Sequence, residues 1–133
     1  MHGYQATTRG IEVSVRALYL EDQSDPDAST WVWAYQVRIE NKGTETVQLL
    51  RRTWRILDGR GRMQVVQGDG VVGEQPVLEP GEVFEYTSGT PLETPSGIMA
   101  GEYHMIATVR GEAFDAEIPP FSLDMPAAER RMH

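Results

Sequence analysis

The stretch WVWAYQVRI, residues 31–39, decides the fold class, because large apolar side chains recur in it at every second position. The apolar set is Trp31, Trp33, Tyr35, Val37 and Ile39. Gln36 and Arg38 are among the residues on the opposite face. Successive side chains of an extended chain point to opposite faces, so this period of two predicts a β-strand with one face buried.

Turn residues on both sides of later segments predict the neighbouring strands. Asn41-Lys42-Gly43 tolerates the positive φ angles of a tight turn, so residues 47–57 are expected to return as the second strand of a hairpin. Asp58-Gly59-Arg60-Gly61 leads into a strand at residues 63–67, and Glu79-Pro80-Gly81 leads into another at residues 83–87.

Alternating patterns at residues 11–16 and 103–110 predict further strands, and the turn at residues 110–112 leads into one at residues 114–118. Pro119-Pro120 is expected to interrupt pairing and to leave an edge segment at residues 121–123. Seven to eight short antiparallel strands predict an all-β sandwich of the fibronectin type III-like or immunoglobulin-like kind, with a small barrel as the alternative.

The chain length predicts one domain, because 133 residues suffice for one hydrophobic core. We assign the domain to residues 1–125 and a flexible C-terminal tail to residues 126–133. Loops are expected at residues 21–29, 68–76 and 89–100. Strands make the core of a sandwich, so function is expected on these loops or on an exposed part of a sheet.

Composition excludes several classes of protein. The net charge of −8, with Lys42 as the only lysine, repels nucleic acid backbones and anionic membranes, so neither is expected as a partner. The absence of cysteine excludes disulfides, thiol nucleophiles and thiolate metal sites. No segment approaches the roughly 20 apolar residues that span a bilayer, and the N-terminus lacks a secretory pattern. These features predict a cytoplasmic protein.

The stretch GDGVVGEQP, residues 68–76, contains the G-x-G-x-x-G spacing of dinucleotide-binding loops in Gly68, Gly70 and Gly73. In such loops the last glycine opens a helix whose N-terminus attracts the pyrophosphate. No helical period follows here, and the Asp69 carboxylate would repel phosphate. The glycines therefore favour a bulge or tight bend where a strand changes sheet. A nest of backbone amides for a small anion is the alternative.

Five arginines lie within a dozen residues of this otherwise acidic chain, namely Arg51, Arg52, Arg55, Arg60 and Arg62. Such a cluster is typical of an exposed strand whose arginines pair with carboxylates. Alternatively, it completes an anion site beside the glycine loop. The candidate ligand-binding residues are therefore Gly68, Asp69, Gly70, Gly73, Arg51, Arg52 and Arg55.

The inventory of reactive side chains predicts no catalytic residue and no metal ligand. Two of the three histidines are near the termini, and His104 is expected on the sandwich surface. The carboxylates of residues 21–27 lack the glycine and terminal glutamate of an EF-hand loop, which predicts a solvated acidic loop. Trp31, Trp33 and Trp54 are expected in the core, with Trp54 the one to check for exposure.

The segments YLEDQSDPDASTWVWAYQVRIEN, GDGVVGEQPVLEPGEVFEYTSG and EIPPFSL resemble the bacterial ApaG family, over roughly residues 8–123. The resemblance implies a fibronectin type III-like sandwich in a small cytoplasmic protein associated with magnesium and cobalt tolerance or efflux. It implies no cofactor beyond a weak association with either cation. Similar eukaryotic domains are appended to F-box proteins, where they look like protein-binding modules. Thr90 stands where many members are expected to have cysteine, so no thiol chemistry is implied.

Together these features predict a non-enzymatic interaction module. Protein partners would bind through the glycine loop, the 89–100 loop or an exposed sheet edge by strand addition, and a homodimer is a further option. The alternative is a binder or sensor of phosphorylated small molecules, such as pyrophosphate or a nucleotide polyphosphate with Mg²⁺, through the glycine loop and its arginines. Metal-dependent hydrolysis of such ligands ranks last, because no histidine or lysine is placed to assist it.

Overall fold

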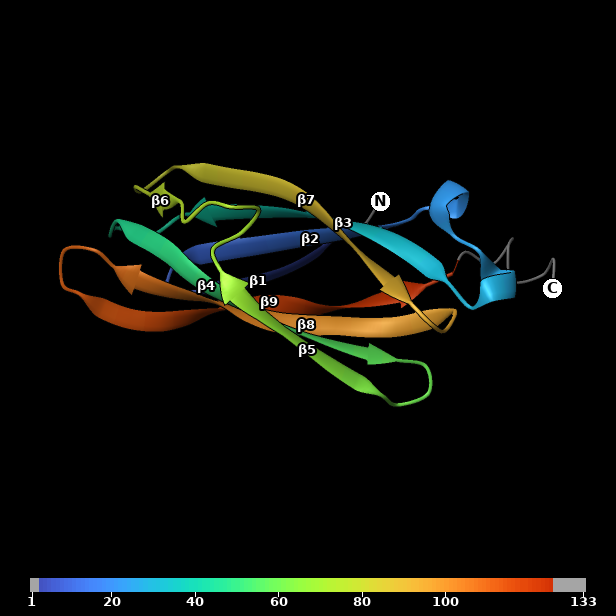
Figure 1. Cartoon of the computed structure of the whole chain (residues 1–133). Helices are drawn as coiled ribbons and strands as arrows, with labels where there is room; N and C mark the ends of the chain where they lie inside the picture. Colours follow the sequence, from blue (N-terminus) through green and yellow to red (C-terminus); the bar gives the residue numbers. More distant parts are fainter. Residues whose placement is uncertain (1–2, 126–133) are drawn as a thin grey trace.

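Two antiparallel sheets face each other in the computed structural model, which describes residues 3–125 (Figure 1). The four-stranded sheet has the order β1 (Tyr4–Thr8), β2 (Ile11–Tyr19), β3 (Trp31–Asn41) and β7 (Val83–Leu92). The five-stranded sheet has the order β5 (Met63–Asp69), β4 (Val47–Asp58), β8 (Ser96–Ala107) and β9 (Glu112–Asp124), and β6 (Val77–Leu78) also pairs with β4.

The all-β sandwich predicted from the sequence is confirmed. The described residues contain nine strands, because β1 and the two-residue β6 were not among the seven to eight expected. The acidic loop before β3 contains two 3₁₀ turns, η1 (Glu21–Gln23) and η2 (Pro26–Ala28). No helix in residues 3–125 has the length and apolar character needed to cross a membrane. The tail expected at residues 126–133 lies outside the described part of the chain.

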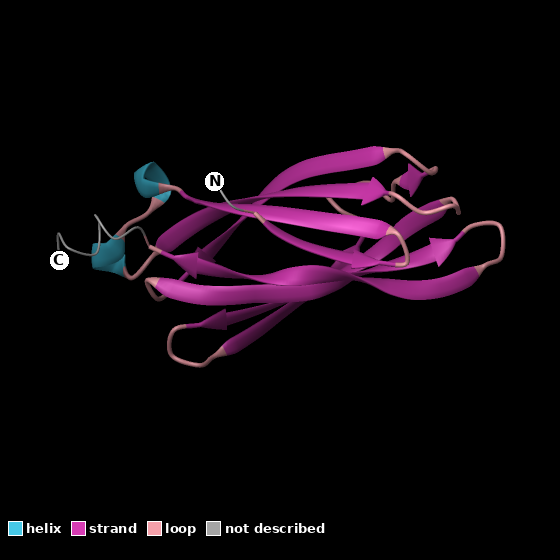
Figure 2. Ribbon diagram, turned by 180° about the vertical axis from the view of Figure 1, so that it is seen from behind, coloured by secondary structure: helices cyan, strands magenta, loops and turns pink. Residues whose placement is uncertain are grey.

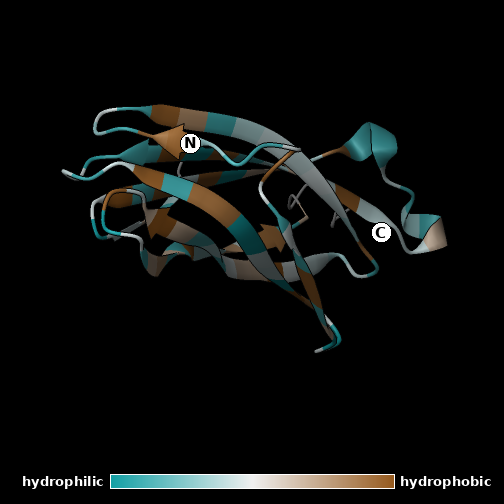
Figure 3. Cartoon of the chain, turned by 60° about the vertical axis from the view of Figure 1, so that its left-hand side comes forward, coloured by the Kyte–Doolittle hydropathy of each residue, from teal (hydrophilic) through white to brown (hydrophobic). Residues whose placement is uncertain are grey.

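The core lies between the two sheets and takes one face of each long strand. Apolar and polar residues alternate along the strands, which is visible as changing colour in Figure 3. Trp54 is buried, and its ring centroid lies 5.1 Å from Tyr35 of the facing sheet and 6.0 Å from Phe121. Trp33 is also buried and Trp31 is half-buried, as expected from the period of two.

The expected hairpin between residues 31–39 and 47–57 is wrong, since β3 and β4 belong to different sheets. The buried Asn41 side chain organises this crossing: its amide nitrogen donates to the carbonyls of Glu45 at 2.7 Å and Leu78 at 2.9 Å, and its oxygen accepts from the Gly43 amide. Periodicity shows which face of a strand is buried but not which strand lies beside it.

The loop expected at residues 89–100 is also wrong. β7 continues to Leu92, β8 begins at Ser96, and Leu92 and Met99 are buried. Glycine and proline have a low strand propensity, but the pairing of β7 with β3 and of β8 with β4 outweighs it.

Pro119-Pro120 does not end the last strand. β9 runs on to Asp124, and its pairing with β8 shifts register beside the two prolines. Prolines are tolerated in bulges and edge strands because no ladder hydrogen bond is needed from them there. Burial of Phe121 and Leu123 beyond the bulge favours the continued strand.

The two sheets are joined along the side where β1 meets β9. The Thr8 hydroxyl accepts from the Glu117 amide at 3.1 Å, the hydroxyls of Tyr4 and Ser122 lie 3.0 Å apart, and Arg9 pairs with Glu112 at 2.7 Å. On the opposite side β5 and β7 are the outermost strands. There the β4–β5 hairpin swings away from the four-stranded sheet, as Figures 1 and 2 show from two sides.

Candidate functional site

The glycine loop makes an excursion along one edge of β4. The chain leaves this edge at the end of β5 and returns to it as β6. The expectation that the strand changes sheet at this loop is therefore wrong. Its tip is a two-residue turn at Val72 and Gly73, with φ angles of 42° and 82°. Val71 and Glu74 exchange backbone hydrogen bonds of 2.8 and 2.9 Å across it. The next element is β6, so no helix follows Gly73.

Two of the motif's glycines lie in close contacts, with the backbone at Gly70 and with a side chain at Gly68. A Cβ atom on Gly70, where φ is +62°, would lie 2.9 Å from the carbonyl carbon of Glu74 and closer still to its oxygen. A Cβ atom on Gly68 would lie 2.9 and 3.0 Å from the terminal nitrogens of Arg52. Gly73 has free space around it and serves the turn through its positive φ. The turn therefore explains Gly70 and Gly73, and Gly68 leaves room for the Arg52 guanidinium.

Arg52 fastens the start of the loop. Its guanidinium lies against Gly68, and Nη1 donates to the backbone carbonyls of Asp69 at 3.0 Å and Gly70 at 2.8 Å. Beneath it the hydroxyls of Tyr86 and Tyr103 form a hydrogen bond between the two sheets. Burial raises the pKa of both tyrosines, so both hydroxyls stay protonated and one donates to the other.

The other two candidate arginines are held by carboxylates. Arg55 makes a two-pronged contact with Glu102 of β8, with both nitrogen–oxygen distances at 2.9 Å. Arg51 lies beside the loop, with Nε 3.6 Å from a carboxylate oxygen of Asp69. The structure thus gathers Arg51 and Arg52 at the glycine loop but places Arg55 further along β4.

β5 forms the free edge of its sheet and carries exposed apolar side chains. Met63 and Val65 are 57% and 56% exposed on its outward face, and Ile98 of β8 is 48% exposed. The register places Leu57 between Met63 and Ile98 in one row across three strands. We call Leu57, Met63, Val65 and Ile98 the β5 patch. The sequence does not reveal this patch, because apolar residues lie on both faces of β5 and do not say which face stays uncovered.

A hollow of about 380 Å³ lies on the other side of the same hairpin. Ile56 and Leu92 are its buried apolar residues, and Met63 borders it. Arg62 links the β4–β5 turn to the β7–β8 turn beside the hollow, because its guanidinium lies 3.0 Å from Asp58 and 2.9 Å from Glu93. The backbone amides of Arg62 and Arg60 also donate to Asp58, which lowers the pKa of its carboxyl group.

His104 lies on the outer face of the five-stranded sheet, as predicted, but it has two close partners. Its ring nitrogens lie 2.7 Å from the Thr53 hydroxyl and 2.7 Å from the Asp115 carboxylate, and Gln67 donates to the same hydroxyl at 3.3 Å. The order resembles a hydrolase triad. Thr53 is only 3% exposed, however, so its hydroxyl is covered, and the contacts link four strands instead. Cross-strand register, invisible in the sequence, brings these residues together.

Metal-ligating side chains do not gather anywhere in residues 3–125: no three histidine, aspartate or glutamate groups converge there. The acidic residues between β2 and β3 are spread over η1, η2 and the bend between them.

A family model described as the ApaG domain matches residues 21–107. The Protein ApaG of Parvibaculum lavamentivorans is 59% identical over 98% of this chain and 99% of its own length, and that of Paramagnetospirillum magneticum is 61% identical over the same shares. The crystal structure of the ApaA protein from Bordetella pertussis superimposes with a TM-score of 0.85 at 50% identity, covering 88% of this chain and 94% of the other.

Proposed function

The chain belongs to the ApaG family, and from this membership and the geometry of β5 we propose that it is a non-enzymatic protein-interaction module of the cytoplasm. Its partner docks on the β5 patch and adds a strand to the free edge of β5. The magnesium and cobalt tolerance associated with the family would then act through this partner.

The observation that carries the proposal is that nothing in residues 3–125 protects the β5 edge. Natural sheets usually protect an edge strand with proline, lysine, a bulge or a covering segment. β9 has Pro119 and Pro120 and lies against β1, and β7 has Pro91. β5, with the sequence MQVVQGD, has neither proline nor lysine and exposes Met63 and Val65. Exposed apolar side chains grouped at a free edge are typical of a binding surface.

Strand addition uses both faces of this edge. The unpaired N–H and C=O groups of β5 would bond the main chain of the incoming segment, and its alternate side chains would point to opposite faces. On the outward face these side chains would contact Met63 and Val65. On the inward face they would meet the hollow between Ile56 and Leu92.

Site-specific photocrosslinking tests the proposal. A photoreactive phenylalanine derivative at position 65 should capture one partner in cells, whereas the same group at position 109, where Val109 is 91% exposed in a distant turn, should not. The purified partner should then bind Val65→Lys at least about tenfold more weakly, because burying an unpaired ammonium is costly, and should bind Val109→Lys normally. Equal capture at both positions, or unchanged affinity of Val65→Lys, would contradict the proposal.

Binding of phosphorylated small molecules stays a prediction, favoured by the position of Arg51 and Arg52 at the loop. A phosphate there would compete with existing hydrogen bonds. The Gly70 and Val71 amides already donate to backbone carbonyls, and Arg52 donates to the carbonyls of Asp69 and Gly70. Pyrophosphate titration followed by NMR of residues 68–73 tests it, with Arg51, Arg52 and Arg55 replaced by glutamine. Saturable shifts that disappear in this variant would support it.

A further inference from the structure

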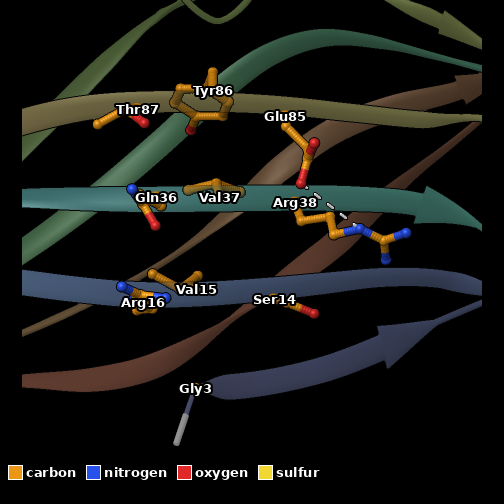
Figure 4. Close-up of a pocket in the computed structure, with 10 residues that line it drawn as sticks. All are labelled: Gly3, Ser14, Val15, Arg16, Gln36, Val37, Arg38, Glu85, Tyr86 and Thr87. Atoms are coloured by element: carbon orange, nitrogen blue, oxygen red, sulfur yellow. Dashed lines mark ion pairs between the residues drawn. The ribbon is translucent and has the colours of Figure 1, made fainter. Parts of the chain in front are cut away.

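A row of hydrogen-bonding side chains crosses the outer face of the four-stranded sheet. The strand register aligns Arg16 of β2 with Gln36 of β3, and Gln36 with Thr87 of β7. These residues line a shallow hollow of about 520 Å³, whose floor is the sheet itself (Figure 4). Val15 and Val37 below the row are buried in the core, so the backbone that carries the three side chains is well supported.

The row differs from the next one along the same strands, where charges are neutralised internally. There Arg38 pairs with Glu40 at 2.7 Å and approaches Glu85 at 3.8 Å, the contact that the dashed line in Figure 4 marks. Within residues 3–125, by contrast, Arg16 has no carboxylate within 4.0 Å.

The side chains of Gln36 and Thr87 also have no hydrogen-bond partner in the described part of the chain. Both residues are exposed. The amide and hydroxyl are donors, and the guanidinium has five N–H groups in a planar fork that matches an oxyanion. Directly opposed residues of antiparallel strands have Cβ atoms about 5 Å apart, so an anion above the central Gln36 has Arg16 on one side and Thr87 on the other.

We propose that Arg16, Gln36 and Thr87 form a binding site for a small oxyanion, the phosphate or carboxylate group of a polar ligand. Arg16 supplies the charge, and Gln36 and Thr87 supply neutral donors from the two neighbouring strands. Glu85, the carboxylate of the next row, lies 3.8 Å from the opposed Arg38, which partly neutralises it. The site is open to water, so the affinity for an isolated anion is expected to be weak and sensitive to salt.

This site is independent of the proposed docking surface, because it belongs to the outer face of the other sheet. Failure of the β5 proposal leaves it intact, and the reverse holds as well.

The test is an NMR titration with inorganic phosphate and, separately, with succinate, at constant ionic strength set with chloride. We expect saturable shifts of the Arg16, Gln36 and Thr87 amides, and the anion that binds more tightly identifies the chemical class. Arg16→Gln should weaken binding about tenfold or more, because it removes a charge-assisted hydrogen bond.

The matched control is Arg60→Gln, which removes the same charge from another exposed arginine without a carboxylate partner in the described chain. Arg60→Gln should change the affinity for the anion by less than about twofold, because the β4–β5 turn is far from the Arg16 site and salt screens its charge. Thermal unfolding of both variants confirms that they fold. Absence of saturable shifts with either anion, equal binding by Arg16→Gln, or equal loss in Arg60→Gln would each overturn the site.

Discussion

Replacing Gly70 with alanine tests the structural role of the glycine motif. In the native loop Gly70 has a φ of +62°, and its amide donates to the Leu50 carbonyl at 2.8 Å. The new Cβ would lie 2.9 Å from the Glu74 carbonyl carbon and would overlap its oxygen. These are backbone atoms that cannot rotate away, so the turn must open.

The expected loss of stability has two parts. A left-handed conformation costs alanine roughly 1–2 kcal/mol relative to glycine. Opening the turn also sacrifices the two hydrogen bonds between Val71 and Glu74, at roughly 0.5–1.5 kcal/mol each. Gly70→Ala should therefore lower the free energy of unfolding by about 2–5 kcal/mol.

Gly73→Ala is the matched control, because Gly73 also has a positive φ, of 82°, but no atom within 4 Å of an added Cβ. It incurs the conformational cost without the clash, so its loss should be about 1–2 kcal/mol. Urea unfolding followed by tryptophan fluorescence measures both values. Equal losses in the two variants, or an unaffected Gly70→Ala, would refute the explanation of the motif by the turn.

Three further variants test other parts of the fold. Asn41→Ala should cost about 2–4 kcal/mol in urea unfolding, because the carbonyls of Glu45 and Leu78 lose their partner at a fully buried site; a loss below about 1 kcal/mol would contradict this. Thr53→Val should cost about 1–2 kcal/mol by the same assay, because it leaves a ring nitrogen of His104 unpaired, and a neutral effect would dismiss the cross-strand network. The pKa of Asp58 in the folded protein lies below its ordinary value of 3.8, so the stabilisation by its carboxylate is present above pH 3.8 and is lost as the pH falls through the folded pKa. The melting temperatures of wild type and Asp58→Asn should therefore converge in acid. A difference that stays constant with pH would contradict the lowered pKa.

The strands themselves could be predicted well from the sequence, but their neighbours could not. The alternation in residues 31–39 predicted β3 and its buried face, because side-chain direction in a strand is a local property. The partner of β3 depends on the path after Asn41, which is set by the distant Leu78 carbonyl. Local turn chemistry therefore suggested a hairpin where the chain crosses to the other sheet.

Local features of the candidate site could be predicted from the sequence, but contacts between distant residues could not. The missing helix after Gly73 followed from local sequence, since no helical period was present. The contact of Arg52 with Gly68 could not be predicted, because it depends on the register between β4 and β5. The β5 patch could not be predicted either, because Met63 and Val65 are exposed only where no other part of residues 3–125 covers that face of the sheet.

Hydrogen exchange of β5 in the presence of the captured partner measures the proposed interaction most directly. Strand addition would bond those β5 amides that point away from β4, so exchange in residues 63–69 should slow strongly on binding. The β8–β9 turn around Val109 should be unaffected and serves as the internal reference. Unchanged exchange throughout residues 63–69, with protection at another surface, would contradict the proposal that the β5 edge is the docking site.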